Sequence, residues 1–508
     1  MNKKFLPAIM LLLVFFSSTS AIYLNDFLVN SDAQKDFDEF PFVLSDAYGN
    51  FSVFWTKYSN SPAYGKVYLK RYSLNGIPLG TAVSLTPDTL KVFDPARIAM
   101  HPSGSFVLAW TDYSRWYPPY YTRHIYFQQF DSLANPLGPL VKVDQNPLDS
   151  QTYVADVGMD AQGNFVIVWT EGFGEAMFAR RYKNDGTPAG PIFQPAFCSS
   201  YECSDPTDPR ITMHPDGQFI IVWYDNIVEF NGYVPMGRMY DSSTVPLWPE
   251  AQVLTCDDSI LVPRCGGTWG SCLIGNSPDA DINIGGDFMM FHGACDGEPF
   301  NNNVYGRLFD PFGAPSTHNF KVNDENANTY DLYPKAHFVP SGGYLSIWAD
   351  SRHNENNGPR DIFLQRYDGL GNPIGINWRV NTPRASPRYN WISYDVACNG
   401  DKVFAVWADF RDRMPTGDTI VNNIYGQLTD IGQVGFFIPG DANFDGGISL
   451  ADVIHLVNYI FKHATPPDPE LWIGDVNADC RVTLADVIYL VNYIFKPGWQ
   501  PPAKGCAE

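Results

Sequence analysis

Two acidic loops near the C-terminus carry the residues best suited to chemistry. They are twelve residues long, span 441–452 and 475–486, and lie in register at a 34-residue offset. A hard cation such as Ca²⁺ takes side-chain oxygens from loop positions 1, 3, 5 and 12, a carbonyl from position 7 and a water-bridging group from position 9. Those positions are Asp441, Asn443, Asp445, Gly447, Ser449 and Asp452 in the first loop, and Asp475, Asn477, Asp479, Arg481, Thr483 and Asp486 in the second. The spacing therefore predicts two calcium sites.

Each loop leads into a helix-forming segment, and the two segments are almost identical. Residues 450–461 and 484–495 carry apolar side chains at helical spacing and differ only at His455 and Tyr489. No helix of usable length is expected before either loop, and position 12 is Asp, whereas an EF-hand has Glu there. Residues 440–508 thus resemble the type I dockerin family.

The resemblance implies two loop-helix units that fold around two calcium ions and bind a cohesin module of a scaffold or cell-surface protein. Family contacts with the partner fall on loop positions 10 and 11, which are Leu450, Ala451, Leu484 and Ala485 in this chain. Because the two pairs are identical, the module could present either helix. Cys480 departs from the family pattern, because position 6 normally holds Gly in a left-handed turn. Either the second site is weaker, or a disulfide to Cys506 fixes Cys480 there.

The N-terminus has the composition of a secretory signal peptide. Residues 1–21 contain Lys3 and Lys4, then a twelve-residue apolar run, then small residues. That run is too short to span a membrane, and no later stretch is long and apolar enough. The mature chain, from about residue 22, is therefore expected to be secreted and to lack a membrane span.

Nine cysteines fit an oxidising compartment. Six of them lie within one hundred residues and could form three bridges in fifteen ways: Cys198, Cys203, Cys256, Cys265, Cys272 and Cys295. We favour a Cys198–Cys203 bridge and leave the other pairings open. Cys398 is then left over and is expected to be buried.

Charge and composition limit the class of the protein. The formal net charge is −21 over 508 residues. Phosphate binding needs basic patches and the sequence has none, so nucleic acid is an improbable partner. Aromatic residues make up 15% of the chain, and 42 Gly and 40 Pro accompany few helical periodicities, which favours an all-β body.

One unit recurs seven times in that body, at intervals of 54 to 69 residues. Its clearest part is an apolar strand that ends in Trp55, Trp110, Trp169, Trp223, His292, Trp348 and Trp407. These strands are apolar at nearly every position, which indicates burial on both faces. A hairpin turn precedes the strand and further strands follow it, as in a propeller blade. We therefore predict a mainly β chain, with a seven-bladed β-propeller over 22–435 and a small all-α calcium-binding module over 440–508.

The two ends of the repeat region are expected to meet in one blade. Residues 26–30 match residues 319–323 at a fourth strand, and the seventh unit lacks a clear fourth strand of its own. The N-terminal strand should therefore complete the last blade and close the ring, which removes exposed sheet edges. Short turns share one face of the ring, and long variable links share the other, where a ligand is expected.

An acid stands two residues after the repeated Trp in five units: Asp112, Glu171, Asp225, Asp350 and Asp409. A glycosidase needs two carboxylates about 5–10 Å apart. An acid that recurs at the same position in most blades is more naturally explained by a structural role, in which it ends the strand by accepting hydrogen bonds from turn amides or pairs with the nearby Arg352 and Arg411. We therefore favour a structural role for these acids, and the sequence assigns no catalytic residue.

A Pro-stiffened aromatic loop is the best local candidate for ligand binding. Its residues Trp116, Tyr117, Tyr120 and Tyr121 could stack on sugar rings, although packing at the rim explains them equally well. Trp269, in an insertion between Cys256 and Cys272, could wall one side of a groove. His292 could ligate a metal beside Cys295, but a lone His is more often a core residue.

These observations favour a secreted protein whose propeller recognises a polysaccharide or a protein without catalysis. Cohesin would anchor it to an extracellular complex, and the setting would be polysaccharide catabolism. The alternative is a carbohydrate-active hydrolase or lyase with its site on the long-loop face. A third hypothesis, that the terminal module only packs on its own propeller, is favoured by the short join at 438–440.

Overall fold

The computed structural model describes residues 26–30, 37–58, 65–87, 92, 95–117, 120–144, 152–172, 176–196, 206–227, 232–248, 252–253, 278–295, 302–324, 332–352, 360–382, 393–411, 422–432, 439–443, 448–464, 466–467, 471–496, 498–503 and 505. Several predictions lie outside these residues: the signal peptide over 1–21, the Cys198–Cys203 bridge, the insertion from Cys256 to Cys272 with Trp269, and Cys506. Cys398 is buried and has a free thiol, as predicted.

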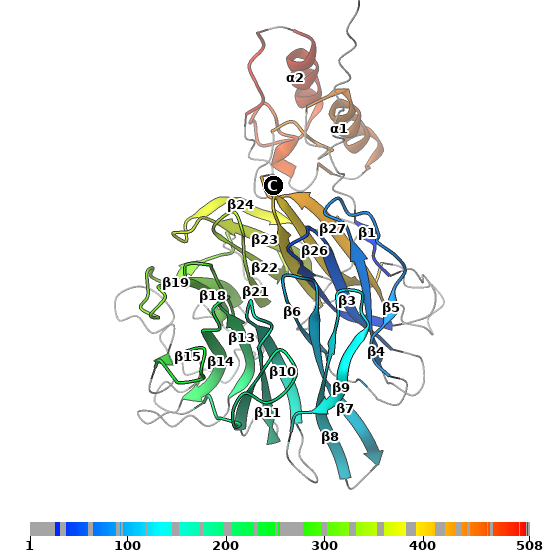
Figure 1. The fold of residues 1–508 in the computed structure, drawn as a ribbon. Coiled ribbons are helices and arrows are strands. Elements are labelled where there is room, and N and C mark those ends of the chain that lie inside the picture. Colours follow the sequence, from blue (N-terminus) through cyan, green and yellow to red (C-terminus); the bar gives the residue numbers. More distant parts are fainter. Residues whose placement is uncertain are drawn as a thin grey trace, which may run out of the picture.

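The described strands form seven antiparallel sheets, which are the blades of a propeller (Figure 1). Blades one and two contain β2 (Phe37–Ser45), β3 (Phe51–Tyr58), β4 (Gly65–Tyr72) and β5 (Val83–Ser84), then β6 (Arg97–Met100), β7 (Phe106–Tyr117), β8 (Tyr120–Phe130) and β9 (Pro136–Lys142). Blades three and four contain β10 (Thr152–Met159), β11 (Phe165–Glu171) and β12 (Ala176–Tyr182), then β13 (Thr207–Met213), β14 (Phe219–Ile227), β15 (Gly232–Tyr240) and β16 (Gln252–Val253).

Blades five and six contain β17 (Asp279–Ile282), β18 (Phe288–Cys295), β19 (Asn302–Phe309) and β20 (Phe320–Lys321), then β21 (Leu332–Phe338), β22 (Tyr344–Asp350), β23 (Asp361–Tyr367) and β24 (Pro373–Arg379). Blade seven contains β25 (Tyr394–Asn399), β26 (Lys402–Asp409), β27 (Asn423–Asp430) and the N-terminal β1 (Phe27–Leu28). The predicted mainly β, seven-bladed propeller is therefore confirmed.

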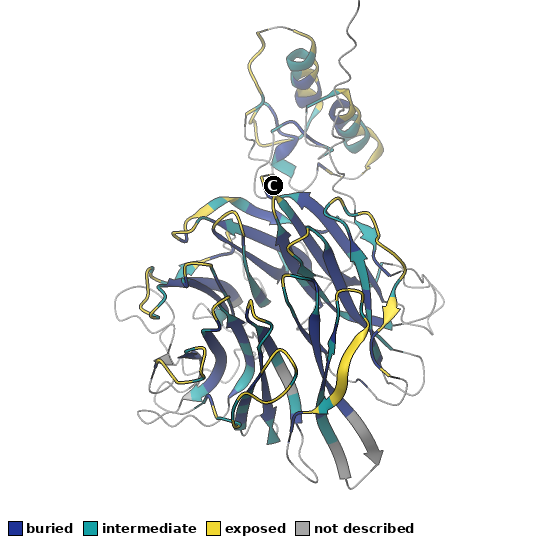
Figure 2. Cartoon of the chain, in the orientation of Figure 1, coloured by how far each residue is buried: buried dark blue, intermediate teal, exposed yellow. Residues whose placement is uncertain are grey.

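The first strand of each blade lies at the axis, and the second is sandwiched between neighbouring blades. The strands β2, β6, β10, β13, β17, β21 and β25 contact one another in a closed circuit. Second strands are buried throughout most of their length (Figure 2), and the repeated side chains Trp110, Trp169, Trp223, Trp348 and Trp407 have at most 1% of their surface exposed. The burial expected from their continuous apolar pattern is present.

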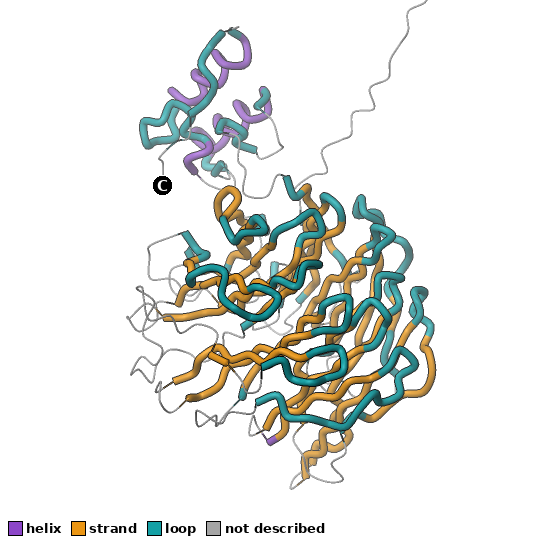
Figure 3. The backbone as a smooth tube through the Cα atoms, turned by 60° about the vertical axis from the view of Figure 1, so that its left-hand side comes forward, coloured by secondary structure: helices purple, strands orange, loops and turns teal. Residues whose placement is uncertain are grey.

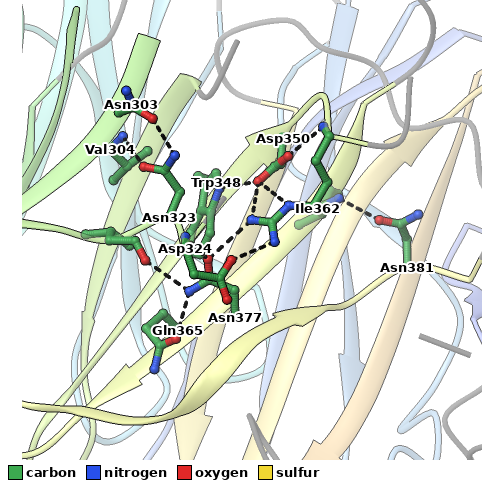
Figure 4. Close-up of polar contacts among 12 residues, drawn as sticks. Asn303, Val304, Asn323, Asp324, Trp348, Asp350, Ile362, Gln365, Asn377 and Asn381 are labelled. Carbon is green, nitrogen blue, oxygen red and sulfur yellow. Dashed lines mark hydrogen bonds and ion pairs between the residues drawn. The ribbon is translucent and has the colours of Figure 1, made fainter. Parts of the chain in front are cut away.

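β1 takes the place of a fourth strand in blade seven. It pairs antiparallel with β27, and the Val29 amide donates to the Ile424 carbonyl at 2.8 Å. The Asn30 side-chain oxygen accepts from the Ile424 amide at 3.0 Å. The same bond recurs after other fourth strands, from Val304 to Asn323 at 2.9 Å and from Ile362 to Asn381 at 2.6 Å (Figure 4). The match between residues 26–30 and 319–323 therefore reflects equivalent positions.

Residues 439–505 form a separate helical unit at the C-terminus. It contains α1 (Leu450–Lys462), a 3₁₀ helix η3 (Leu471–Ile473) and α2 (Leu484–Phe495). The small core combines equivalent side chains of the two repeats: Ala442 with Val476, Val453 with Val487, and Leu456 with Leu490. Figures 1 and 3 show both helices standing beyond the blades. No helix within the described ranges is both long and apolar enough to cross a membrane.

Candidate functional site

The second acidic loop brings its carboxylates together. Ligand atoms of Asp475, Asp479 and Asp486 all lie within 4.8 Å of one another. Asp475 and Asp486 are fully buried. Burial raises the pKa of Asp486, and the Asp475 and Asp479 carboxylates raise it further. Asp479 is exposed, so the set opens to solvent on one side. Hard oxygen donors that repel one another at such a place are chemically suited to a divalent cation such as Ca²⁺.

Helix capping positions the last carboxylate of each loop. Thr483 is the N-cap of α2, and Asp486 accepts its amide at 2.8 Å and the Asn477 amide at 3.3 Å. In the first loop, Ser449 caps α1, and Asp452 accepts the amides of residues 449 and 443 at 2.7 and 3.1 Å. The two loops therefore share one backbone design. Asp445 and Gly447 of the first loop lie outside the described residues.

Cys480 occupies a strained position in the second loop. Its φ is 66°, in the left-handed region where a side chain is unfavourable. Its amide donates to Asp475 at 3.0 Å, and its sulfur is engaged in a disulfide bond. A side chain at Gly505 would place its Cβ 2.5 Å from the Asp475 carbonyl, so the C-terminal tail lies directly against this loop. The pairing of Cys480 with Cys506 stays a prediction.

Each helix exposes a matching row of apolar side chains. On α1 these are Leu450, Ile454 and Phe461, with 51%, 54% and 60% of their surface exposed. On α2 the equivalent residues Leu484, Ile488 and Phe495 have 50%, 54% and 62% exposed. Ala451 and Ala485 lie beside them in the first helical turns, where their amides donate hydrogen bonds to the N-cap side chains of Ser449 and Thr483. The two predicted partner-binding pairs thus belong to two equivalent surfaces.

The acids that follow the repeated Trp have a structural role. The indole Nε1 donates to the acid of its own strand in four blades, from Trp169 to Glu171, Trp223 to Asp225 and Trp348 to Asp350 at 3.1 Å, and from Trp407 to Asp409 at 2.9 Å. Figure 4 shows the contact in blade six. Asp225, Asp350 and Asp409 are fully buried, so a substrate cannot reach them. The preference for a structural interpretation is supported.

The two predicted arginine partners complete this arrangement in blades six and seven. Arg352 donates to Asp350 at 2.6 Å and to Asp324 at 2.8 Å, and its guanidinium lies 3.9 Å from the Phe363 ring centroid. In blade seven, Arg411 contacts Asp409 at 2.6 Å and Asp26 at 2.7 Å in the same way. The Arg352–Asp324 pair joins blade six to the segment that follows β20 of blade five, and the Arg411–Asp26 pair ties the N-terminal segment to blade seven.

The aromatic loop forms the tip of the long β7–β8 hairpin. Trp116 pairs with Tyr121 and Tyr117 with Tyr120 along the backbone. Figure 1 shows this tip at the end of the propeller away from α1 and α2. The side chains of residues 113–122 lie outside the described part of the chain, so their predicted role in ligand binding stays a prediction.

His292 is a core residue. It is 2% exposed, and its ring stacks on Tyr305 with a centroid distance of 5.9 Å. Burial lowers the pKa of His292 to about 4, so the imidazole is neutral at pH 7. The alternative of a metal ligand beside Cys295 gains no support, since the Cys295 side chain lies outside the described residues.

Seven residues at the propeller axis occupy equivalent positions, and we call them the axial ring. Each lies on a first strand and pairs with the residue just before the repeated Trp or His292. In blade order they are Phe42, Arg97, Asp156, Arg210, Asp279, Lys335 and Asp395. Positive and negative side chains alternate from blade two to blade seven. An odd number of places cannot all alternate in charge, and Phe42 is the neutral member.

Side chains of the axial ring converge. The Lys335 Nζ lies 4.7 Å from the centroid of the Phe42 ring, although blades six and one are not neighbours. The Arg97 guanidinium lies 5.3 Å from the same centroid. Lys335 also donates to Asp395 at 3.1 Å. Contacts that skip a blade are possible only where side chains approach the axis.

Each acid of the ring also binds the next blade. Asp156 accepts the Ile211 amide at 3.0 Å, Asp279 the Ala336 amide at 3.2 Å, and Asp395 the Val43 amide at 3.0 Å. Burial raises the pKa of Asp279 to about 7, while Arg210 and Lys335 act in the opposite direction. Burial lowers the pKa of Arg97 to about 9. Ionised groups held at such a cost are often functional.

The sequence contained a signal for the ring that our sequence analysis missed. Its members stand thirteen residues before the repeated Trp or His292, and twelve residues before it in the seventh unit. Aligning the units on that residue displays the alternation of charge.

Comparisons with known proteins add fold similarity only. No family model matches the chain, and no curated protein matches it. Among solved structures, the chain is similar to the polysaccharide lyase Uly1, with 11% identity, a TM-score of 0.47, and coverage of 77% of this chain and 89% of that one. It is similar to a protein of unknown function from Dyadobacter fermentans, with 10% identity, a TM-score of 0.44, and coverage of 80% and 98%. An α-L-arabinanase from Penicillium chrysogenum has 13% identity, a TM-score of 0.43, and coverage of 81% and 99%. Likeness at this level says nothing about activity.

Proposed function

We propose that this chain is a secreted calcium-binding protein that attaches to a cohesin module through residues 440–508 and recognises a polysaccharide or a protein with its propeller. The observation that carries the proposal is the second acidic loop, where three carboxylates converge at the N-terminus of a capped helix. The first loop repeats the same capping bonds. Two calcium ions would complete the module, one in each loop.

The exposed rows on α1 and α2 support partner binding through either helix. Apolar side chains that are half exposed on a small module are suited to an interface. In Figures 1 and 3 the helices stand away from the blades, which argues against the hypothesis that the module merely packs on its own propeller. Attachment through this module would leave the β7–β8 end of the propeller accessible.

A charged residue in the exposed apolar row of one helix is expected to leave cohesin binding intact. Charged residues in the rows of both helices are expected to abolish it. Leu450→Asp or Leu484→Asp leaves one intact helix, whereas the double variant puts an ionised group into each apolar surface. The measurement is binding of the calcium-loaded chain to a panel of cohesin modules by calorimetry, with Leu133→Asp on the propeller as control. Undiminished binding by the double variant would contradict the proposal, as would no binding to any cohesin by the unchanged chain.

A second candidate function is hydrolysis or lyase cleavage of a carbohydrate at the propeller axis. It is favoured by Asp279, whose pKa of about 7 suits a general acid at neutral pH. Because the acid form is needed, the rate should fall as the pH rises through 7. Asp279→Asn is expected to lower the rate about 10²–10⁴-fold. The cleavage rate is measured as the release of reducing ends or unsaturated products from a panel of polysaccharides. A rate that Asp279→Asn does not change rejects this candidate.

We also infer that β1 closes the ring. Its pairing with β27, together with the core that Phe51 of blade one shares with Phe404 of blade seven at a centroid distance of 5.4 Å, supports this inference. Val29 is fully buried, and its amide bonds to Ile424. Val29→Pro removes that bond, while Val29→Ala removes only methyl groups. We expect the Pro variant to lose about 3 kcal/mol or more and the Ala variant about 1–3 kcal/mol in urea unfolding. Equal, small losses would refute closure by this strand.

A further inference from the structure

The axial ring presents hydrogen-bond donors and acceptors in alternation. The side chains of Arg97, Arg210 and Lys335 are donors only, and the ionised side chains of Asp156, Asp279 and Asp395 are acceptors only. A sugar hydroxyl donates one hydrogen bond and accepts others, so it suits a place between an acid and a base. Neighbouring hydroxyls around a sugar ring present this need repeatedly. Alternating charges at the axis meet it.

The ring is accessible to water. Arg97 is 5% exposed, whereas the other six members are only partly buried. The side chains of Lys335 and Asp395 keep 12% and 14% of their surface exposed. Side chains that line a dry, packed axis would show no such exposure. Solvent therefore reaches the ring members at this level of the axis.

Phe42 supplies the apolar surface that sugar binding also requires. Its first strand has a β-bulge between Glu39 and Phe42, where Phe40 has a φ of 55°. The same bulge with a left-handed residue before Pro precedes two other ring members, Asp208 with φ 50° before Arg210 and Tyr333 with φ 56° before Lys335. Bulges redirect side chains, and strained backbone of this kind is concentrated at functional sites.

The charges of the ring sum to zero when all six are ionised. A charged ligand would therefore gain attraction from three members and meet repulsion from the other three. A neutral ligand with many hydroxyl groups gains hydrogen bonds from both kinds without this conflict. Hydrogen bonds to charged groups are the stronger ones.

We infer that the axial ring binds a neutral sugar unit, with its hydroxyls between the alternating acids and bases and its apolar face on Phe42. This inference rests on the proposed recognition of polysaccharide by the propeller and names the site. It places that site at the axis, whereas the sequence had pointed to the tip of the β7–β8 hairpin.

Binding of the full-length protein to neutral gluco-, xylo-, arabino- and galacto-oligosaccharides tests the site, first on an array and then by calorimetry. Asp156→Asn and Asp279→Asn keep an oxygen for the Ile211 and Ala336 amides, so the contact between blades survives. Each is expected to weaken binding about 10–100-fold. Phe42→Leu keeps an apolar side chain and is expected to weaken it about 3–10-fold. Tyr48→Ala, in an exposed turn of the same blade, is the matched control.

The outcomes separate the axial site from carbohydrate recognition in general. Binding that falls in the three ring variants and not in Tyr48→Ala, at unchanged melting temperatures, supports the axial site. Binding kept by the ring variants but lost in Trp116→Ala with Tyr120→Ala overturns the axial site and leaves carbohydrate recognition standing. No binding to any of these oligosaccharides overturns both.

Discussion

Removing calcium with EGTA is expected to unfold residues 439–505 and to leave the seven blades folded. The module buries four acids, Asp441, Asp452, Asp475 and Asp486, each at most 2% exposed. Without a cation these groups repel one another, and the small core of the module has little else to oppose that repulsion. At a calcium concentration about 100 times the Kd, binding stabilises by about 2.7 kcal/mol.

Hydrogen exchange measures this effect in the full-length protein. Amides of α1 and α2 are expected to exchange about 100-fold faster in EGTA, in proportion to the lost stability. Amides of the central strand β22 serve as the internal control and should not change. Mg²⁺ should restore less protection than Ca²⁺, because it needs a tighter octahedral geometry. Protection of both helices that is the same in EGTA as in calcium would show that these loops are ordinary acidic turns.

Replacing Gly343 with Ala is expected to destabilise the propeller more than the addition of a methyl group at almost any other position. Gly343 follows the turn between β21 and β22, with φ at +94°, and an added Cβ would lie 2.1 Å from the Tyr367 carbonyl oxygen. That oxygen belongs to the backbone of β23 and cannot rotate away. The clash adds to the cost of the left-handed backbone, so we expect a loss of about 4 kcal/mol or more.

The adjacent Gly342 provides a matched control. Its φ is +106°, and an added Cβ would have nothing within 4 Å. Gly342→Ala is therefore expected to lower the stability only by the cost of the backbone conformation, about 1–3 kcal/mol. Urea unfolding followed by tryptophan fluorescence compares the two variants. Losses of equal size would mean that β22 and β23 move apart at little cost, contrary to the close packing of this blade.

The C-terminal module was the part most open to prediction from sequence. Capped helices depend on residues within about one turn of each other, so short motifs carry them. The helices begin at Leu450 and Leu484, where the pattern places them. The exposed rows follow from the same periodicity, since every third or fourth residue shares a face.

The number of blades was likewise determined by the sequence, because a strand buried on both faces must be apolar at almost every position and this pattern recurs seven times. The repeat of the acids favoured a structural role, and the tertiary structure showed which groups they contact. Asp350 and Asp409 are each buried against their own Trp and Arg. The axial ring contains residues as far apart in sequence as Phe42 and Asp395. These residues come together only when the seven first strands assemble around one axis. Local patterns report interactions with near neighbours, whereas convergence at an axis depends on how the whole ring is assembled.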